Sequence, residues 1–282
     1  SRQTAEMKTL VSTMTFISLP RAICRDFGGD FLFRDRFRLR QGLRGVYEKL
    51  GVSDVTPLGA ANAGEDVQYA DLTDPQEAER VMAGIDCIVH MAGQSVEADW
   101  PTILAKNVSA VYNVFEAARR QNVKRVIFAS SHHAIGFYRR ERLIDNQVPP
   151  RPDSRYGVSK AFGEALGRLY ADKYGLAVAC LRIGVVRVKP EDVRHLSVWV
   201  SPRDMLQLVR RCIDAPAYHY AMIYAVSANS RAFWKNPDAE LIGYRPEDSA
   251  DTYAAELLAA AKPENPLAAP FHGGYYCPPE FC

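Results

Sequence analysis

From about residue 46 onwards, short runs of continuous apolar residues alternate with longer segments of helical periodicity. The runs are DCIVHMAG (86–93), KRVIFASS (124–131) and LAVACLRIGVV (176–186), and they are separated by an amphipathic helical segment at 100–121 and a helix at 154–174. Because Val, Ile and Ala do not alternate with polar residues, each run would be a strand buried on both faces. Helices on both faces of a parallel sheet provide such burial, so the pattern predicts a doubly wound α/β fold.

Weaker signals extend this pattern along the chain. Strands are expected at the end of 46–55 and over 66–72, and a helix over 74–84, capped by Asp74 and ended by Gly84. After about residue 187 the alternation loosens, and we expect a smaller lobe against the sheet. Its expected elements are helices at 202–214, 233–243 and 247–261 and a strand near 219–226. The predicted division is an atypical segment at 1–45, a sheet-forming core at 46–186 and a lobe at 187–282.

Composition excludes several classes of partner. The 35 basic and 33 acidic side chains nearly balance, which argues against a nucleic-acid partner, since such a partner would require a basic stripe. No run approaches the ~18–20 apolar residues of a membrane span. The stretch 7–22 faintly resembles a secretory leader, but Ser and Thr interrupt its apolar part. Six scattered cysteines without a C-x-x-C pair fit free thiols in a reducing compartment, so we expect no metal site and a cytoplasmic location.

The carboxyl ends of the predicted strands indicate where the chemistry should lie. Ligands of open parallel sheets bind at this edge. The residues at these ends are Asp54, Asp71–Leu72, Met91–Ala92–Gly93, Ser130–Ser131 and Ile183–Gly184.

Tyr156 and Lys160 are spaced for one face of the helix predicted over 154–174. A neighbouring ammonium favours the phenolate and lowers the pKa of a phenol, so this tyrosine could act as a general base near neutral pH. Taken alone, the pair could equally be solvated on a helix surface. Two further residues favour a site: Ser131, a hydroxyl at a strand end 25 residues earlier, and Asn107 in the helix predicted at 100–121.

These residues, with their surroundings, resemble the extended short-chain dehydrogenase/reductase family. The matching stretches, in family order over about 46–190, are ADL (70–72), HMAGQS (90–95), NVSAVYNVFEAARR (107–120), VIFASS (126–131), YGVSK (156–160) and LRIG (181–184). The resemblance implies a Rossmann fold, a nicotinamide cofactor, and Ser131, Tyr156 and Lys160 as the catalytic trio. It further implies that Lys160 grips the nicotinamide ribose and that Asn107 holds a water in the proton relay.

Within this family the chain resembles the uronate dehydrogenases from about residue 46 to 276. The stretches SSHHAIGFY (130–138), RIGVVRVKPEDVRHLSVWVSPRD (182–204) and FHGGYY (271–276) carry this likeness. It implies NAD-dependent oxidation of the anomeric carbon of galacturonate or glucuronate to an aldarolactone. The implied substrate-binding residues are Ser95, Ser131, His132, His133 and Arg194, with the Arg194 guanidinium as a bidentate clamp on the carboxylate. His132 stands where asparagine is expected and Val185 where serine is expected, which leaves the sugar preference open.

The resemblance also assigns a set of cofactor residues. Asp54 would accept hydrogen bonds from the adenosine ribose diol and repel a 2′-phosphate, which favours NAD over NADP. From the sequence alone, Asp54 could equally cap a turn before Thr56 and Pro57. Asp71 and Leu72 would lie by the adenine. Met91, Ala92 and Gly93 would lie by the pyrophosphate and the nicotinamide ribose, and Ile183 and Lys160 complete the set.

The first 45 residues depart from the family pattern. A dinucleotide-binding fold opens with a strand and a glycine-rich turn, for which KTLVST (8–13) and Gly28–Gly29 are the available segments. Asp30, Phe31 and Phe33 follow the glycines and are poor neighbours for a pyrophosphate. One hypothesis is an altered reading frame or gene boundary, which the other frames of the coding DNA would test.

Two alternative functions therefore stay open. One is a cofactor-impaired, non-catalytic homologue that keeps the fold. The other is a nucleotide-sugar epimerase or dehydratase, although the short region after 187 suits a small sugar acid better. A homo-oligomer through the helices at 101–121 and 154–174 is also possible, because their apolar faces could be interface or core.

Overall fold

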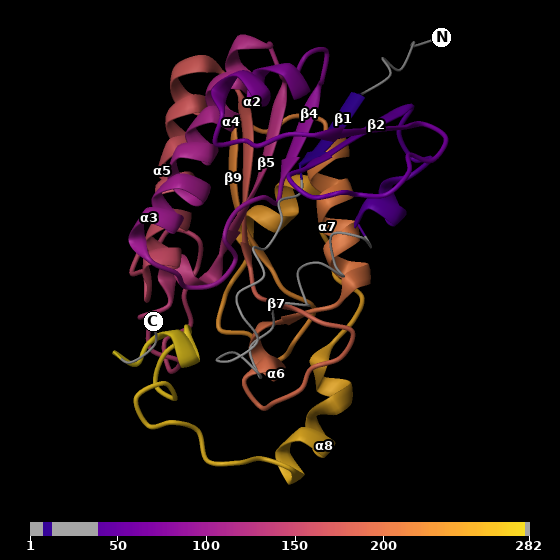
Figure 1. The fold of residues 1–282 in the computed structure, drawn as a ribbon. Helices are drawn as coiled ribbons and strands as arrows, with labels where there is room; N and C mark the ends of the chain where they lie inside the picture. The colour runs from indigo at the N-terminus through magenta and orange to yellow at the C-terminus, as the bar shows by residue number, and fades with distance from the viewer. Residues whose placement is uncertain (1–7, 13–38, 280–282) are drawn as a thin grey trace.

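The computed structural model describes residues 8–12 and 39–279. Seven parallel strands form one sheet in the order β3-β2-β1-β4-β5-β6-β9 (Figure 1). Strand order reverses between β1 and β4, which is the topological switch point of a Rossmann-like sheet. The doubly wound parallel fold is confirmed. The strands of the sheet are β1 (Lys8–Ser12), β2 (Lys49–Asp54), β3 (Glu65–Tyr69), β4 (Cys87–His90), β5 (Arg125–Ser131), β6 (Ala177–Ile183) and β9 (Tyr220–Ala225).

Helices connect these strands, and a second, two-stranded sheet lies after β6. The described helical elements are a turn at 39–43, α2 (Pro75–Val81), α3 (Trp100–Ile103), η1 (Leu104–Ser109), α4 (Ala110–Arg120), η2 (His132–Ile135), α5 (Arg155–Tyr174), α6 (His195–Val198), α7 (Pro202–Asp214), η3 (Pro237–Ile242), η4 (Ala250–Tyr253), α8 (Ala254–Ala259) and η5 (Gly274–Tyr276). The small sheet pairs β7 (Val185–Val186) with β8 (Trp199–Val200).

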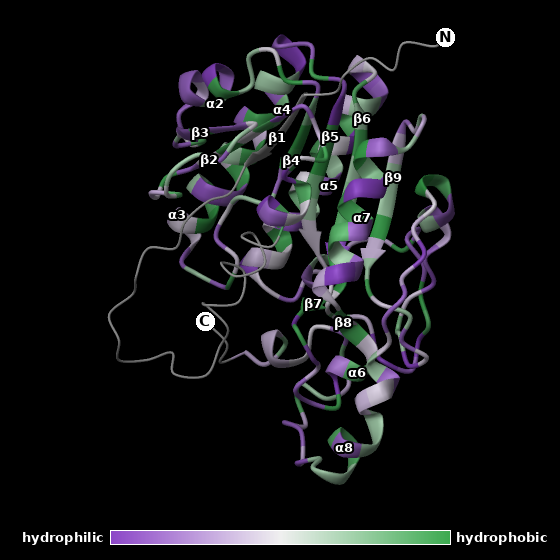
Figure 2. Cartoon of the chain, turned by 90° about the vertical axis from the view of Figure 1, so that its right-hand side faces the viewer, coloured by the Kyte–Doolittle hydropathy of each residue, from purple (hydrophilic) through white to green (hydrophobic). Residues whose placement is uncertain are grey.

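Alternate side chains of the central strands enter two separate cores. Ile88, Val126 and Phe128 pack with α2, α4 and α5 on one face. Cys87, Val89 and Ile127 pack with the turn at 39–43 and with α7 on the other face. This period of two follows from the pleat of a strand, and Figure 2 shows the apolar residues gathered in the sheet. The continuous apolar runs are therefore explained by helices on both faces.

The predicted helix at 100–121 is interrupted. Its residues Leu104–Ser109 form a π-helical turn between α3 and α4, and this turn contains Asn107. Such turns are rare and occur mostly at functional sites, and apolar periodicity does not reveal them. The helices predicted at 233–243 and 247–261 are likewise shorter, as η3 and as η4 with α8.

Two predictions concern the limits of the sheet-forming core: the strand and glycine turn that should open it, and its end at residue 186. KTLVST was one possible first strand, and Lys8–Ser12 pairs in parallel with both β2 and β4. Gly28–Gly29 lies outside the described residues. The region after 187 contributes the edge strand β9 to the sheet and α7 to the core on one of its faces, while α6 and α8 lie below the sheet in Figure 1. The division at 186 stays a prediction.

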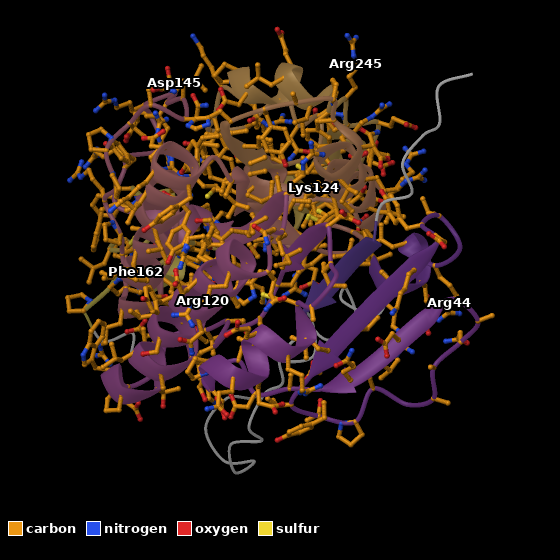
Figure 3. All side chains as sticks on the ribbon, turned by 90° about the horizontal axis from the view of Figure 1, so that it is seen from above. Arg44, Arg120, Lys124, Asp145, Phe162 and Arg245 are labelled. Carbon is orange, nitrogen blue, oxygen red and sulfur yellow. The ribbon has the colours of Figure 1, made fainter. Side chains whose placement is uncertain are left out.

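The amino ends and the carboxyl ends of the strands lie at opposite edges of the sheet. Figure 3 looks onto the amino-terminal edge, where Lys124 precedes β5 and pairs with Asp86 at 2.7 Å. The residues singled out from the sequence lie at the opposite edge, at the carboxyl ends of the strands. Within the described ranges, no helix has the length and apolar character needed to cross a membrane.

Candidate active site

Helix α5 presents Tyr156 and Lys160 to the carboxyl edge of the sheet. Ser154 caps the helix by accepting a hydrogen bond from the Gly157 amide, and the Glu97 carboxylate accepts one from the Tyr156 amide at 2.8 Å. Tyr156 and Lys160 are both buried. The Lys160 ammonium donates to the Ala129 carbonyl at 2.7 Å and lies 5.4 Å from the centroid of the Tyr156 ring. The pair is therefore not the solvated surface pair that the spacing alone allowed.

Ser131 ends β5 and lies beside the same helix. Its Oγ accepts a hydrogen bond from the His133 amide at 3.2 Å, which caps the turn η2. The imidazole of His133 lies 5.8 Å from the Tyr156 ring. A Cβ at Gly157 would collide with the His133 carbonyl oxygen, so glycine lets α5 approach this turn closely. The structure brings Ser131, His133, Tyr156 and Lys160 together.

Asn107 is buried behind Tyr156. Its side-chain amide donates to Ser159 Oγ at 3.0 Å, and that hydroxyl donates to the Tyr156 carbonyl at 2.7 Å. Asn107 also exchanges hydrogen bonds with the backbone of Gln94. Its side chain therefore ties the loop after β4 to α5. The predicted water relay stays a prediction.

Asp153 is a site residue that the sequence reasoning missed. Its Oδ2 lies 2.7 Å from His133 Nδ1, and its other oxygen accepts from Ser154. A Cβ at Gly136 or Gly273 would collide with this carboxylate, so glycine at both positions leaves the space that Asp153 occupies. The only sequence signal was its place directly before the helix cap, and a turn would explain that place equally well.

Tyr276 was missed as well. Its ring contacts the imidazole of His133 at a centroid distance of 3.9 Å, with the two planes tilted by 33°. The stretch FHGGYY was singled out for its resemblance, but nothing in it indicated which residue it would contact. The C-terminal segment therefore covers one side of the site.

Arg194 and His132 form the other side of the site. Arg194 Nη2 lies 2.8 Å from His132 Nε2 and also donates to the His272 carbonyl. Burial, then His133 and then Arg194 hold the pKa of His132 well below its usual value, so this imidazole is neutral. Burial is also the largest cause that lowers the pKa of His272, to about 4. Arg194 thus lies among neutral rings and a carbonyl.

The loop after β4 holds Met91, Ala92 and Gly93, which the resemblance assigns to the pyrophosphate and nicotinamide ribose. Ala92 and Gly93 are buried and Met91 is half-buried. Gly93 has φ +129°, and a Cβ there would lie 2.7 Å from Asn107 Oδ1. The hydroxyl of Ser95 is buried, and the described part of the chain provides it with no hydrogen-bond partner. This loop therefore offers glycine backbone and a hydroxyl to a ligand.

The two carboxylates predicted to lie by the adenosine both make tight turns. Asp54 ends β2, and its Oδ1 accepts from the amide and hydroxyl of Thr56. Asp71 makes the same arrangement with Thr73, and Leu72 beside it is buried. The turn interpretation of Asp54 is therefore correct as local structure. Its ligand role stays a prediction, since a turn fixes the carboxylate at the sheet edge.

Ile183 ends β6 and offers its backbone to the site. Its carbonyl oxygen lies 2.9 Å from His132 Nδ1. Its predicted contact with a cofactor stays a prediction.

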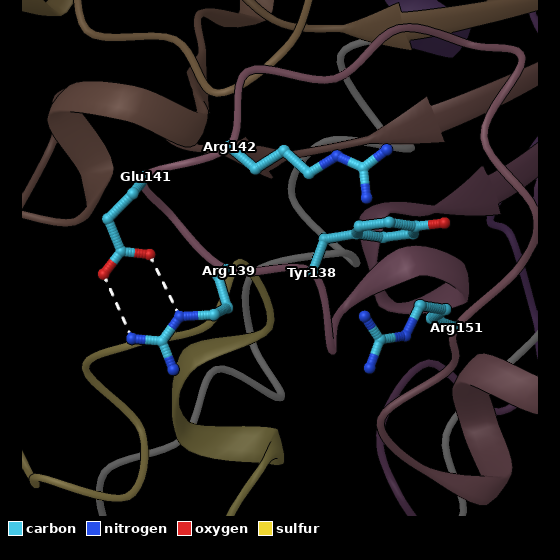
Figure 4. A pocket seen from close by; sticks show the side chains of 5 residues that line it. All are labelled: Tyr138, Arg139, Glu141, Arg142 and Arg151. Carbon is cyan, nitrogen blue, oxygen red and sulfur yellow. Dashed lines mark hydrogen bonds and ion pairs between the residues drawn. The ribbon is translucent and has the colours of Figure 1, made fainter.

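A surface hollow lies on the loop beyond η2 and holds none of these residues. Tyr138, Arg139, Glu141, Arg142 and Arg151 line it (Figure 4). The guanidinium groups of Arg142 and Arg151 lie 5.3 Å and 5.2 Å from the Tyr138 ring, on its two sides. Arg139 pairs with Glu141. This hollow is separate from the candidate active site.

Comparison with known proteins agrees with the fold and the site. A protein-family model described as the NAD dependent epimerase/dehydratase family matches residues 39–190. The uronate dehydrogenase of Pseudomonas putida is 40% identical over 226 residues, which cover 80% of this chain and 84% of that protein. That of Pseudomonas syringae pv. tomato is 38% identical over 240 residues, 84% of this chain and 87% of that protein.

Solved structures give the same result. The crystal structure of uronate dehydrogenase from Agrobacterium tumefaciens superposes with a TM-score of 0.85 at 33% identity, covering 96% of this chain and 97% of that one. The resemblance found in the sequence is therefore confirmed. With a seven-stranded Rossmann-like sheet and a buried tyrosine–lysine pair at its carboxyl edge, the chain belongs to the NAD dependent epimerase/dehydratase family.

Proposed function

We propose that the protein oxidises the anomeric carbon of a uronic acid, galacturonate or glucuronate, to the aldarolactone with NAD as oxidant. The observation that supports the proposal is the contact of Arg194 with His132, the first residue of the turn η2 after Ser131. The guanidinium contacts His132, whose ring lies against that of His133 in the same turn. A sugar held at its anomeric end by Ser131 and Tyr156 would thus have its carboxylate near a cation.

The residues at the carboxyl edge fit NAD. Buried Asp54 provides an acceptor for a ribose diol, and the Gly93 backbone leaves space that a side chain would fill. Lys160 provides a buried ammonium for the second ribose. Bound NAD would supply the hydride acceptor for the anomeric C–H. Gly28 and Gly29, the glycines at the distance expected for the opening turn, lie outside the described residues.

The chain's own residues provide the proton chemistry. Tyr156 as phenolate takes the proton of the anomeric hydroxyl while the hydride leaves the same carbon, so the hemiacetal becomes a lactone. Ser131 donates a hydrogen bond to that oxygen, since its Oγ already accepts from the His133 amide. Lys160 keeps a positive charge next to the phenol. Asn107 maintains the position of α5 through Ser159.

The protein groups around the sugar ring select the substrate. Ser95 offers a buried hydroxyl, and His133, held by Asp153, offers its second ring nitrogen. Arg194 binds the carboxylate, because a guanidinium forms strong charge-assisted hydrogen bonds with such a group.

NADH formation tests this function. The purified chain is mixed with NAD and either galacturonate or glucuronate, and absorbance at the NADH wavelength is followed. UDP-glucose and UDP-galactose serve as competing substrates, and Tyr156→Phe shows whether the signal depends on this site. NADH formed from a uronate supports the proposal. Turnover of a nucleotide sugar alone would favour the epimerase alternative, and absence of NAD binding in calorimetry would favour the non-catalytic homologue.

A homo-oligomer is a second part of the proposal. Helices α4 and α5 pack side by side, with Phe115 and Tyr170 rings 5.4 Å apart. Apolar side chains on the outer faces of α3, η1, α4 and α5 are exposed: Trp100, Leu104, Tyr112, Val158 and Leu169. Where such side chains form one contiguous surface, they mark an interface. Light scattering of the purified chain measures the mass; a monomer at every concentration would contradict this part. The cytoplasmic location stays a prediction.

A further inference from the structure

Both ring nitrogens of His132 are engaged by the protein itself. Nδ1 lies 2.9 Å from the Ile183 carbonyl oxygen, and Nε2 lies 2.8 Å from Nη2 of Arg194. A carbonyl oxygen only accepts hydrogen bonds, and a guanidinium only donates them. The proton must therefore be on Nδ1, and Nε2 must accept from Arg194. This neutral tautomer leaves no ring nitrogen for a substrate.

The ring of His132 is also fixed in orientation. It is buried in the turn η2, between His133 at a centroid distance of 4.1 Å and Trp234 at 5.8 Å. Rotation of the ring would break both of its hydrogen bonds. His132 therefore presents a fixed acceptor to Arg194.

The contacts of Arg194 determine which of its atoms can meet a ligand. Nη2 donates one hydrogen to His132 and the other to the His272 carbonyl. Nε is buried next to Gly274, without an acceptor among the described residues. Among the described residues nothing accepts from Nη1, so its hydrogens can meet a ligand, while both hydrogens of Nη2 are used and the bidentate clamp expected from the sequence is not available in this conformation.

We propose that His132 is a positioning residue for substrate recognition, which holds the Arg194 guanidinium so that Nη1 meets the sugar carboxylate. The inference rests on the proposed uronate oxidation and assigns His132 no contact with the sugar. An asparagine, the residue expected from the resemblance, has a shorter side chain and could contact the substrate directly. With histidine at position 132, this residue holds the Arg194 guanidinium, whereas an asparagine there could bind the sugar.

A double-mutant cycle tests the inference. His132→Phe keeps an aromatic ring but removes both nitrogens, and Arg194→Met removes the guanidinium. KM and kcat for galacturonate are measured for the wild type, each single variant and the double variant. His219→Phe, an exposed histidine paired with Asp172, controls for the substitution type. Melting temperature and NADH binding establish that each variant is folded.

The expected result is a split between KM and kcat. His132→Phe should raise KM about tenfold, the effect of one lost hydrogen bond to a charged group, and change kcat little. In the Arg194→Met background the same substitution should have no further effect on KM. His132→Asn, which keeps an acceptor and a donor, should retain part of the affinity.

Two contrary results are distinguishable. If His132→Phe lowers kcat rather than KM, or raises KM by the same factor in the Arg194→Met background, His132 does not act through Arg194 and the inference is overturned. If the wild type forms no NADH from either uronate, the proposed function fails and the inference fails with it.

Discussion

The Lys160 ammonium lies 5.4 Å from the centroid of the Tyr156 ring, one helical turn away on α5, and donates to the carbonyl of Ala129 at 2.7 Å. The hydrogen bond to β5 fixes the cation between helix and sheet. A positive charge buried beside a phenol stabilises the phenolate, because the low local dielectric strengthens their attraction. The pair is thus arranged for proton abstraction at the carboxyl edge of the sheet.

Tyr156→Phe removes the base and keeps the ring. We expect kcat with galacturonate to fall about 100- to 10,000-fold, the range for loss of a general base. NAD binding and melting temperature should stay close to wild type, because Phe keeps the contacts with His133. Stopped-flow NADH formation measures the rate. A fall of less than tenfold would assign the proton transfer to another group.

Asp153→Asn tests the pairing with His133. The carboxylate accepts from Nδ1, so His133 keeps its Nε2 directed away from Asp153. An amide could donate its N–H to Nδ1 instead and would then favour the opposite tautomer. We expect kcat/KM for uronate to fall at least tenfold, with little change in melting temperature. Asp172→Asn, at an exposed carboxylate that also pairs with a histidine, His219, is the matched control and should leave kcat/KM unchanged.

The contribution of His132 to uronate affinity, measured as the ratio of KM for His132→Phe to KM for the wild type, should not change between pH 8 and pH 6. Protonation of His132 would remove the acceptor for Arg194 and raise KM. Burial and the neighbouring His133 and Arg194 hold the pKa of His132 well below its usual value, and the pKa of His272 is lowered to about 4. Both rings therefore stay neutral in this window, as Trp234 and the Ile183 carbonyl, which face His132, carry no charge. A KM ratio that falls toward 1 with an apparent pKa near 6.5 would contradict this arrangement.

The sequence predicted the sheet because each strand carries its own signal. Continuous apolar runs such as 86–93 and 176–186 need two covered faces, and the Tyr156–Lys160 spacing places two side chains on one helix face. Contacts between distant segments carry no such signal. Asp153 bonds to His133, and the Tyr276 ring contacts the same imidazole. Both contacts form because the loop after η2 and the C-terminal segment fold back onto the turn that holds His133. The π-helical turn at Asn107 was hidden for a related reason, since its stabilising partners Gln94 and Ser159 come from other elements.

The buried pair of Arg40 and Glu65 should contribute strongly to stability. Their side chains are 5% and 0% exposed, and the guanidinium also donates to the Leu58 carbonyl. Arg40→Met would leave the Glu65 carboxylate with Arg44 and Asn62 as its remaining partners, so we expect a loss of about 1–3 kcal/mol in the free energy of unfolding. Urea denaturation at pH 7 measures it. Arg168→Met, which breaks an exposed pair with Asp172 on α5, is the matched control and should change the free energy little.

The same pair should show a defined pH dependence. Hydrogen bonds from Arg40, the largest cause, hold the pKa of Glu65 below its usual range. A carboxyl group whose pKa is lower in the folded than in the unfolded protein stabilises the fold at every pH above its unfolded pKa of about 4.3. This contribution is lost as the pH falls from there toward the folded pKa. The difference in unfolding free energy between wild type and Arg40→Met should therefore be largest near pH 7 and shrink below about pH 4. A difference that stayed constant down to pH 3 would mean that Arg40 stabilises the fold through its backbone acceptors and not through the carboxylate.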